Sequence, residues 1–240
     1  MGPELGQSNP EGPSRRTTTN GDVAVTMQKA VPDRGLLAAS GRQLLGKRVL
    51  DIVLALLALI LLSPILLVTA CAIKVSSAGP VLYLQERVGR DGKPFRMLKF
   101  RSMRRDAERQ RSAYLDLNEC AGPLFKIRHD PRVTPVGHVL RKWSIDELPQ
   151  LLNVIHGEMS LVGPRPPLPE ECEQYGPRER QRLLVKPGIT CIWQVSGRSD
   201  VAFAEQVRMD LDYIANWDLV MDIRLLIRTV PAVLEHRGAY

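Results

Sequence analysis

Two adjacent carboxylates, Asp146 and Glu147, lie in the stretch RKWSIDELPQ at residues 141–150, after two cations and before a proline. Neighbouring side chains in a helix point about 100° apart, so an adjacent pair converges on one ligand only where a helix begins or ends. Two interpretations fit this stretch. Ser144 and Glu147 have the spacing of a capping box, which would stabilise a helix start and do no chemistry. Alternatively, the pair belongs to a catalytic site.

The proline after the pair predicts where the next helix begins. Pro149 is tolerated only in the first turn of a helix, so a helix is expected to start near it and to end at Gly157. Both carboxylates are therefore predicted at a helix N-terminus. Free amide groups and the helix dipole favour anions there, and a phosphate group would suit this position as well as a carboxylate.

Three other stretches could bring cations to an anionic ligand. In Gly163-Pro164-Arg165-Pro166-Pro167, prolines hold an arginine rigidly, which suits either a polyproline II recognition motif or a fixed guanidinium for phosphate. The turn-rich stretch KPGITCIWQVSGRSD carries Arg198. The stretch KFRSM carries Lys99 and begins a basic cluster, where a lipid headgroup or lipid phosphate would lie; the alternative is a solvated basic surface.

A long apolar run must position these residues near a membrane. Residues 49–73 contain Asp51 as their one charged residue and match the thickness of a bilayer, but Pro64 interrupts the run near its middle. Cations flank both ends, which places both in the cytoplasm by the positive-inside rule. We therefore expect a re-entrant helix-break-helix with its break at Ser63 and Pro64, where Ser63 satisfies a freed backbone group. A kinked helix that crosses the membrane is the alternative.

The remaining elements indicate an α/β domain. β-prone runs at residues 81–85 and 95–100, separated by Asp91-Gly92, predict a β-hairpin. Near the C-terminus, apolar residues at 219, 220, 223, 226, 227 and 230 form one face of a helix, which either packs in the core or lies on a membrane surface. Residues 1 to about 40 have a composition typical of a disordered tail.

Composition narrows the classes of function. The net charge of +7 over 240 residues indicates anionic partners. The cysteines and histidines lack the spacing of a zinc site or a disulfide framework. The residues concerned are Cys71, Cys120, Cys172, Cys191, His129, His138, His156 and His236. With 5% aromatic residues and no stacking motif, a nucleic-acid binder is disfavoured, and a non-enzymatic membrane scaffold would leave the ordered acids and arginines unexplained.

Several motifs in order resemble one enzyme family. The Ser-Pro interruption, KFRSM, RKWSIDELPQLLNVIHGEMSLVGPRP, KPGITCIWQVSGR and MDIRLLIRT look like the small monotopic phosphoglycosyl transferases, the bacterial sugar transferases that act on undecaprenyl phosphate. The resemblance covers residues 42–230. It implies an α/β catalytic domain on the cytoplasmic face of the bacterial inner membrane, held in the phospholipid bilayer by the re-entrant helix.

The resemblance also implies a reaction and a set of site residues. A sugar 1-phosphate would pass from a UDP-sugar to polyprenyl phosphate with Mg²⁺, giving UMP. Asp146 would be the nucleophile and Glu147 its partner, as a base or as a metal ligand, so that both are candidate metal ligands. The substrate and phosphate site would comprise Lys99, Arg141, Gly163, Pro164, Arg165, Pro166, Arg198 and Asp222. A homodimer is compatible with this scheme.

Some positions depart from the family pattern. Cys191 stands where glycine is usual after KPGIT, and His138 and Trp143 stand where smaller or basic residues are common. We divide the chain into a tail at 1–41, the re-entrant helix at 42–76 and the catalytic domain at 77–240.

Overall fold

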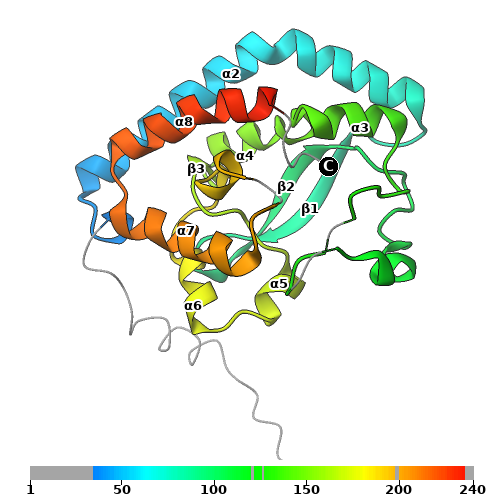
Figure 1. Ribbon diagram of the computed structural model, residues 1–240. Helices are drawn as coiled ribbons and strands as arrows, with labels where there is room; N and C mark the ends of the chain where they lie inside the picture. The colour runs from blue at the N-terminus through cyan, green and yellow to red at the C-terminus, as the bar shows by residue number, and fades with distance from the viewer. Residues whose placement is uncertain (1–34, 120–121, 126, 198–199, 236–240) are drawn as a thin grey trace, which may run out of the picture. The chain divides into compact units, whose positions relative to one another are not determined.

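The computed structural model describes residues 35–119, 122–125, 127–197 and 200–235 (Figure 1). The predicted tail lies almost entirely outside these residues. The helices are α2 (Gly41–Ser76), α3 (Pro135–Lys142), α4 (Gln150–His156), α5 (Pro169–Glu173), α6 (Pro177–Arg180), α7 (Phe203–Asn216) and α8 (Leu219–Leu234), and the strands are β1 (Leu82–Val88), β2 (Pro94–Phe100), β3 (Ser160–Val162) and β4 (Gly188–Thr190). The 3₁₀ turns are η2 (Gly35–Leu37), η3 (Arg90–Gly92), η4 (Arg111–Leu117), η5 (Ile145–Glu147), η6 (Gln181–Leu184) and η7 (Trp193–Val195). The α/β class is as predicted.

The apolar run forms one uninterrupted helix, α2, of 36 residues, so the predicted break into two helices is wrong. Pro64 lies inside the helix and has no amide hydrogen to donate to the carbonyl of Ile60. Ser63 Oγ donates a hydrogen bond to that carbonyl at 2.8 Å, which is the compensation expected for Ser63. Figure 1 shows that the second half of α2 turns away from the line of the first half. The proline therefore bends the helix and does not end it.

Polar contacts hold the first half of α2 against the rest of the fold. Arg48 donates hydrogen bonds to the carbonyls of Val154 and Ile155 at the C-terminus of α4, at 2.5 and 2.8 Å. Asp51 accepts hydrogen bonds from Ser160 Oγ at 3.1 Å and from the amide of Leu161 at 3.0 Å. Ionic groups in an apolar helix are costly unless they are paired. Here they connect α2 to α4 and β3.

The second half of α2 is held at its C-terminus by Arg101, which follows β2. The guanidinium of Arg101 donates hydrogen bonds to the carbonyls of Ala78 at 2.7 Å and Ser77 at 2.9 Å. Ser77 is the cap residue of α2. A cation at this end also interacts favourably with the helix dipole. Both ends of α2 therefore contact the same folded body, through α4 and β3 at one end and through β2 at the other.

The predicted β-hairpin is confirmed, with longer strands than expected. β1 and β2 pair in antiparallel register, with Leu82 opposite Phe100 and Val88 opposite Pro94. Asp91 and Gly92 in the turn have φ values of 61° and 74°, which is the conformation that an Asp-Gly pair tolerates in a tight hairpin. The register places Lys99 near the end of β2, two residues before Arg101.

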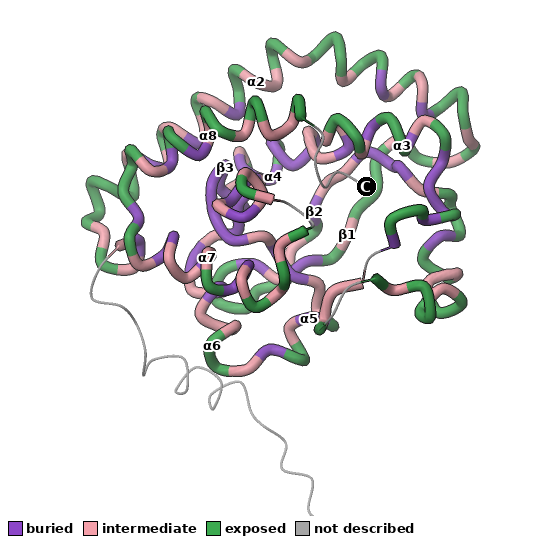
Figure 2. The backbone as a smooth tube through the Cα atoms, viewed as in Figure 1, coloured by how far each residue is buried: buried purple, intermediate pink, exposed green. Residues whose placement is uncertain are grey.

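A second, parallel pair of strands lies in the core. β3 pairs with β4, with Ser160 opposite Gly188 and Val162 opposite Thr190. The main core packs around this pair and includes the buried side chains Leu151, Val154, Met159, Leu161, Val162, Val185, Tyr213, Ile214, Trp217 and Leu225. Figure 2 shows buried backbone concentrated around β3 and α4, whereas most of α2 is exposed or intermediate.

The C-terminal helix α8 presents its predicted apolar face to solvent. Val220 and Ile227 are 52% and 66% exposed, while Asp222 and Leu225 on the other side are 1% and 4% exposed. Most of that face is therefore exposed, although Leu226 of the same face packs against the core. The polar residue Asp222 is buried instead, because Lys47 of α2 pairs with it.

Candidate active site

Ser144 begins the segment that carries the two carboxylates, and it has a left-handed backbone with φ of 55°. Its side chain makes no capping hydrogen bond, so the capping box of Ser144 and Glu147 is wrong. Asp146 and Glu147 lie in the 3₁₀ turn η5, and α4 begins only at Gln150. A non-glycine residue at positive φ is strained. The strained turn aims the pair at the end of β2, so the carboxylates precede helix α4 and do not cap it.

Cations surround Glu147. Lys99 Nζ donates a hydrogen bond to Glu147 Oε1 at 3.0 Å, and the two residues are 48 positions apart in the chain. Burial is the strongest influence and by itself raises the pKa of Glu147, but Lys99, Arg165 and Arg87 together outweigh it and hold that pKa below its usual value. Glu147 is therefore ionised at neutral pH. Its side chain is still 31% exposed, so a ligand can reach it.

Asp146 has the opposite electrostatic situation. The residue is 7% exposed, and burial raises the pKa of its carboxyl above the usual value. Lys99 opposes this rise, the charge of Glu147 adds to it, and Arg141 opposes it. The pair thus contains one carboxylate with a lowered pKa and one with a raised pKa, a pattern that is common where two acids have different roles.

Arg141 lies in the last turn of α3, beside this pair. Its Nε donates a hydrogen bond to Ser102 Oγ at 3.0 Å. Burial lowers the pKa of Arg141, and the charge of Asp146 partly offsets that effect. Arg141 is therefore a cation near Asp146, and Ser102 of the KFRSM stretch orients it.

The segment from Gly163 to Pro167 is fixed by its backbone on two sides. Gly163 donates a hydrogen bond to the carbonyl of Thr190 at 3.0 Å, and Gly188 donates to the carbonyl of Pro164 at 2.9 Å. Val88 of β1 donates to the carbonyl of Pro167 at 3.0 Å. A Cβ atom on Gly188 would lie 2.1 Å from the amide nitrogen of Gly163, so only glycine allows this approach. These contacts give Arg165 a rigid base.

Arg165 presents its guanidinium near Glu147. Its Nη1 donates a hydrogen bond to Glu171 Oε2 at 3.2 Å, and its side chain is 29% exposed. Glu171 is 2% exposed. Among the described residues, no other hydrogen bond from the Arg165 side chain is seen. Arg165 thus has donors left for a ligand.

Arg87 is a cation of this region that the sequence analysis did not assign to the site. It is 5% exposed, and its Nη1 donates a hydrogen bond to the carbonyl of Pro166 at 3.0 Å. Burial, with the nearby charge of Arg165, lowers the pKa of Arg87 to about 9, which leaves it cationic at neutral pH. In the sequence, the signal for Arg87 was its position at the end of a β-prone run in which apolar and polar residues alternate. Glu171, in the first turn of α5, gave no signal beyond its spacing from Arg165.

Not every predicted site residue joins this cluster. Asp222 accepts hydrogen bonds from Lys47 Nζ at 2.6 Å and from Tyr213 Oη at 2.8 Å. Both oxygens of Asp222 are therefore engaged in a buried network that joins α8 to α2 and α7. Arg198 lies outside the described residues.

Two features bear on ligands. No cluster of three or more potential metal-ligating side chains occurs in the part of the chain that the structure describes. Asp146 and Glu147 nevertheless suit Mg²⁺, which commonly takes one or two carboxylates and completes its shell with water and substrate phosphates.

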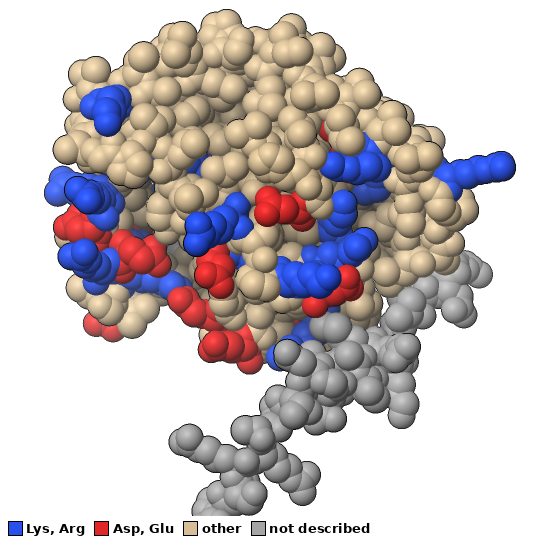
Figure 3. All heavy atoms as spheres, turned by 180° about the vertical axis from the view of Figure 1, so that it is seen from behind, with Lys and Arg blue, Asp and Glu red and all other residues tan. Residues whose placement is uncertain are grey.

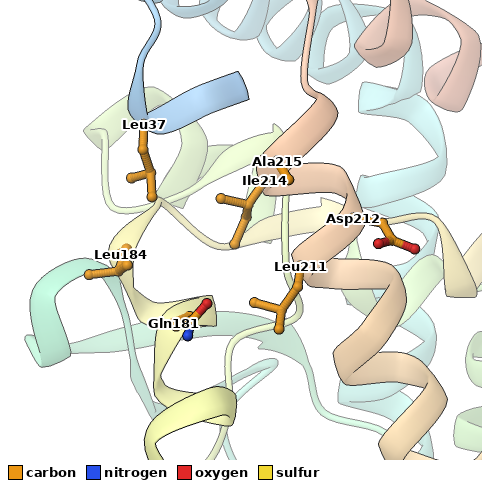
Figure 4. A pocket seen from close by; sticks show the side chains of 7 residues that line it. All are labelled: Leu37, Gln181, Leu184, Leu211, Asp212, Ile214 and Ala215. Carbon is orange, nitrogen blue, oxygen red and sulfur yellow. The ribbon is translucent and has the colours of Figure 1, made fainter. Parts of the chain in front are cut away.

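A cavity of about 160 Å³ lies between η2, η6 and α7 (Figure 4). It is lined by Leu37, Gln181, Leu184, Leu211, Asp212, Ile214 and Ala215. None of the predicted site residues lines it.

Comparison with known proteins gives a consistent match. The model of the bacterial sugar transferase family matches residues 42–236. The exopolysaccharide production protein ExoY of Sinorhizobium fredii is 44% identical over 200 residues, covering 82% of this chain and 88% of the relative. The UDP-glucose:undecaprenyl-phosphate glucose-1-phosphate transferase of Caulobacter vibrioides is 43% identical over 206 residues, covering 82% and 72%. The undecaprenyl-phosphate galactose phosphotransferase of Salmonella typhimurium is 43% identical over 198 residues, covering 81% and 41%.

Proposed function

Because this chain belongs to the bacterial sugar transferase family, we propose that it transfers a sugar 1-phosphate from a UDP-sugar to polyprenyl phosphate, with release of UMP. The observation that carries the proposal is the pair Asp146 and Glu147, set in one turn and surrounded by Lys99, Arg141, Arg165 and Arg87. The reaction joins two anions, and such a site both supplies a nucleophile and offsets the repulsion between them. The product would serve exopolysaccharide or related glycoconjugate assembly.

In the proposed first step, a carboxylate oxygen of Asp146 attacks the β-phosphorus of the UDP-sugar. The bond from this phosphorus to the bridging oxygen breaks, and UMP leaves with that oxygen. In the second step, a phosphate oxygen of the polyprenyl phosphate attacks the same phosphorus and frees the Asp146 carboxylate. Covalent catalysis of this kind divides one difficult transfer into two.

Glu147 has a different role in this proposal. A carboxylate with a lowered pKa is a weak base, and polyprenyl phosphate is mostly dianionic at neutral pH because the second pKa of a phosphomonoester is about 6. We therefore assign Glu147 to charge and metal binding and not to proton removal. With Asp146 it would hold Mg²⁺, which would neutralise charge on the transferred diphosphate. Lys99 keeps Glu147 ionised for this purpose.

The proposed location is the cytoplasmic face of the inner membrane, with α2 in the bilayer. Helix α2 is long and apolar enough to cross a membrane by its length and composition. However, a crossing helix would carry its ends to opposite faces, whereas both ends of α2 contact the same folded body. The bend at Pro64 and these contacts favour entry and exit on one face.

Two other classes of function explain fewer of these observations. A nucleic-acid binder would use the positive charge, and a membrane scaffold would use α2 and α8. Neither requires a buried aspartate beside an ionised glutamate within a ring of cations.

The test is turnover by the purified protein in detergent with Mg²⁺, polyprenyl phosphate and a series of UDP-sugars. We expect repeated UMP release only when both the lipid and one of the UDP-sugars are present, and no more than about one UMP per protein without the lipid. UDP-glucose and UDP-galactose are tested first because relatives carry those names. A folded protein that releases no UMP from any member of the series would refute the proposal. The same series identifies the sugar.

A further inference from the structure

We propose that Glu171 is a positioning residue that holds the guanidinium of Arg165 so that its remaining donors are aimed at the diphosphate of the donor. This inference rests on the function proposed above and extends it to a residue outside the carboxylate pair. It follows from the hydrogen bond that holds the partly exposed Arg165 to the buried carboxylate of Glu171.

The contact between Glu171 and Arg165 is built into the fold. Glu171 is 2% exposed, and its Oε2 accepts hydrogen bonds from Arg165 Nη1 at 3.2 Å and from the amide of Leu168 at 3.1 Å. The Leu168 amide anchors the carboxylate at the start of α5. Because a planar guanidinium has donors in a fixed fork, holding Nη1 sets the direction of the remaining donors. The 29% exposure of Arg165 shows that this free side is open to solvent.

Arg87 strengthens the same arrangement from β1. Its Nη1 holds the carbonyl of Pro166, the residue after Arg165, at 3.0 Å. Arg87 therefore fixes the backbone beside Arg165, while Glu171 holds the Arg165 side chain.

The capping role of Glu171 is separable from its charge. In Glu171→Gln, the side-chain oxygen still accepts from the Leu168 amide, so α5 keeps its start, but the ionic attraction for Arg165 is lost. The neighbouring Glu170 provides a matched control, because its side chain is 61% exposed and pairs with Arg111 instead. Glu170→Gln removes the same charge from the same helix without touching Arg165.

The decisive experiment is a double-mutant cycle of Glu171→Gln and Arg165→Ala, with kcat and KM for the UDP-sugar and a thermal melt for each protein. We expect Glu171→Gln alone to lower kcat/KM about tenfold or more, equivalent to about 1.4 kcal/mol, with little change in the melt. In the Arg165→Ala background, the same change should alter kcat/KM by less than about twofold, because coupled residues are not additive. Glu170→Gln should behave as the wild type.

An equal loss in both backgrounds, or full activity of Glu171→Gln, would overturn the inference. If Glu171→Gln does not fold, Glu171→Asp keeps the charge and enters the same cycle with the same criterion. If the wild type releases no UMP, the proposed function fails by itself. In that case, the affinity of each protein in the cycle for UDP is measured by calorimetry. Losses of UDP affinity that simply add, or a wild type that does not bind UDP, would also overturn the inference.

Discussion

Asp146 and Glu147 are neighbours in the chain, but their carboxylates have different surroundings. Asp146 is buried, with its pKa raised above the usual range, whereas Glu147 accepts a hydrogen bond from Lys99 and has a lowered pKa. The turn that begins at Ser144 produces this difference by pointing successive residues into different environments. Adjacent residues can therefore take separate roles in one site.

Replacement of the nucleophile gives the most direct test at this scale. We expect Asp146→Asn to abolish covalent labelling by a UDP-sugar with radiolabel in the β-phosphate, because an amide is a poor nucleophile. Glu147→Gln should slow both labelling and turnover without abolishing either, because we assign Glu147 to charge and metal binding, which serve both steps. The measurement is protein-bound label after a short pulse quenched in denaturant, beside thermal melts. Label on a folded Asp146→Asn protein would exclude Asp146 as the nucleophile.

The raised pKa of Asp146 predicts the acid side of the pH profile. The nucleophile must be ionised, so kcat should fall as the pH drops through a value above the usual 3.8 of an aspartate. The charge of Glu147 contributes to that rise, so Glu147→Gln should move the acid limb of its residual activity to lower pH. A pH series of kcat for both proteins checks this. An acid limb of the Glu147→Gln profile that stays at the same pH or moves to higher pH would contradict the assignment of Asp146 as the nucleophile.

At the scale of elements, hydrogen bonds connect the C-terminal end of α2 to the residue that follows β2. Lys99 binds Glu147, and two residues later Arg101 binds the C-terminal cap of α2 at Ser77 and Ala78. Lys47 and Asp222 join the other half of α2 to α8 at 2.6 Å. In the proposed membrane location, the depth of α2 in the bilayer would therefore determine how deep the carboxylate pair lies relative to the lipid headgroups.

This arrangement predicts the topology of α2. In a protein whose four native cysteines are replaced by alanine, cysteines introduced at the exposed positions Arg42 and Lys93 should both resist a membrane-impermeant reagent added to intact cells. Both should react after the membrane is permeabilised, which is the control for accessibility. Labelling of one site from outside would indicate a helix that crosses the bilayer.

At the scale of the whole molecule, charged and apolar surfaces are separated. Figure 3 shows acidic and basic side chains gathered over one part of the surface, while a broad upper region has few charges. On α2, Ile60, Leu61, Leu67 and Val68 are all more than 60% exposed, and α8 adds Val220, Ile223, Ile227 and Val230. Soluble proteins rarely expose apolar surface of this extent, which indicates contact with lipid.

The exposed face of α8 should contribute to use of the lipid acceptor. We expect Ile223→Gln with Ile227→Gln to raise the apparent KM for polyprenyl phosphate in vesicles several-fold, because each substitution replaces an apolar side chain at the lipid surface with a polar one. The KM for the UDP-sugar should not change. Arg224→Gln with Arg228→Gln is the control on the same helix. Equal effects of the two pairs, or a raised donor KM, would count against lipid contact by the apolar face.

Several features could be read from the sequence because they depend on local chemistry. The Asp-Gly turn predicted the hairpin, and the apolar run predicted a helix of membrane length. Gly157 was expected to end the helix that follows the carboxylates, and it ends α4 with a φ of 88°. Ser63 compensates the proline as expected. Each of these signals depends on neighbouring residues, whose periodicity and backbone preferences are visible in the chain. The motif order was sufficient to identify the family.

Only the tertiary structure decided which side chains share an environment. Ser144 has the spacing of a capping residue, yet its left-handed backbone and the pull of Lys99 on Glu147 replace the capping box. Asp222 was grouped with the site by its motif, but Lys47, 175 positions away, holds it in the core. Arg87 and Glu171 became relevant through contacts with the segment around Arg165. Such pairings arise from long-range packing, which brings distant charges together and leaves no periodic pattern in the sequence.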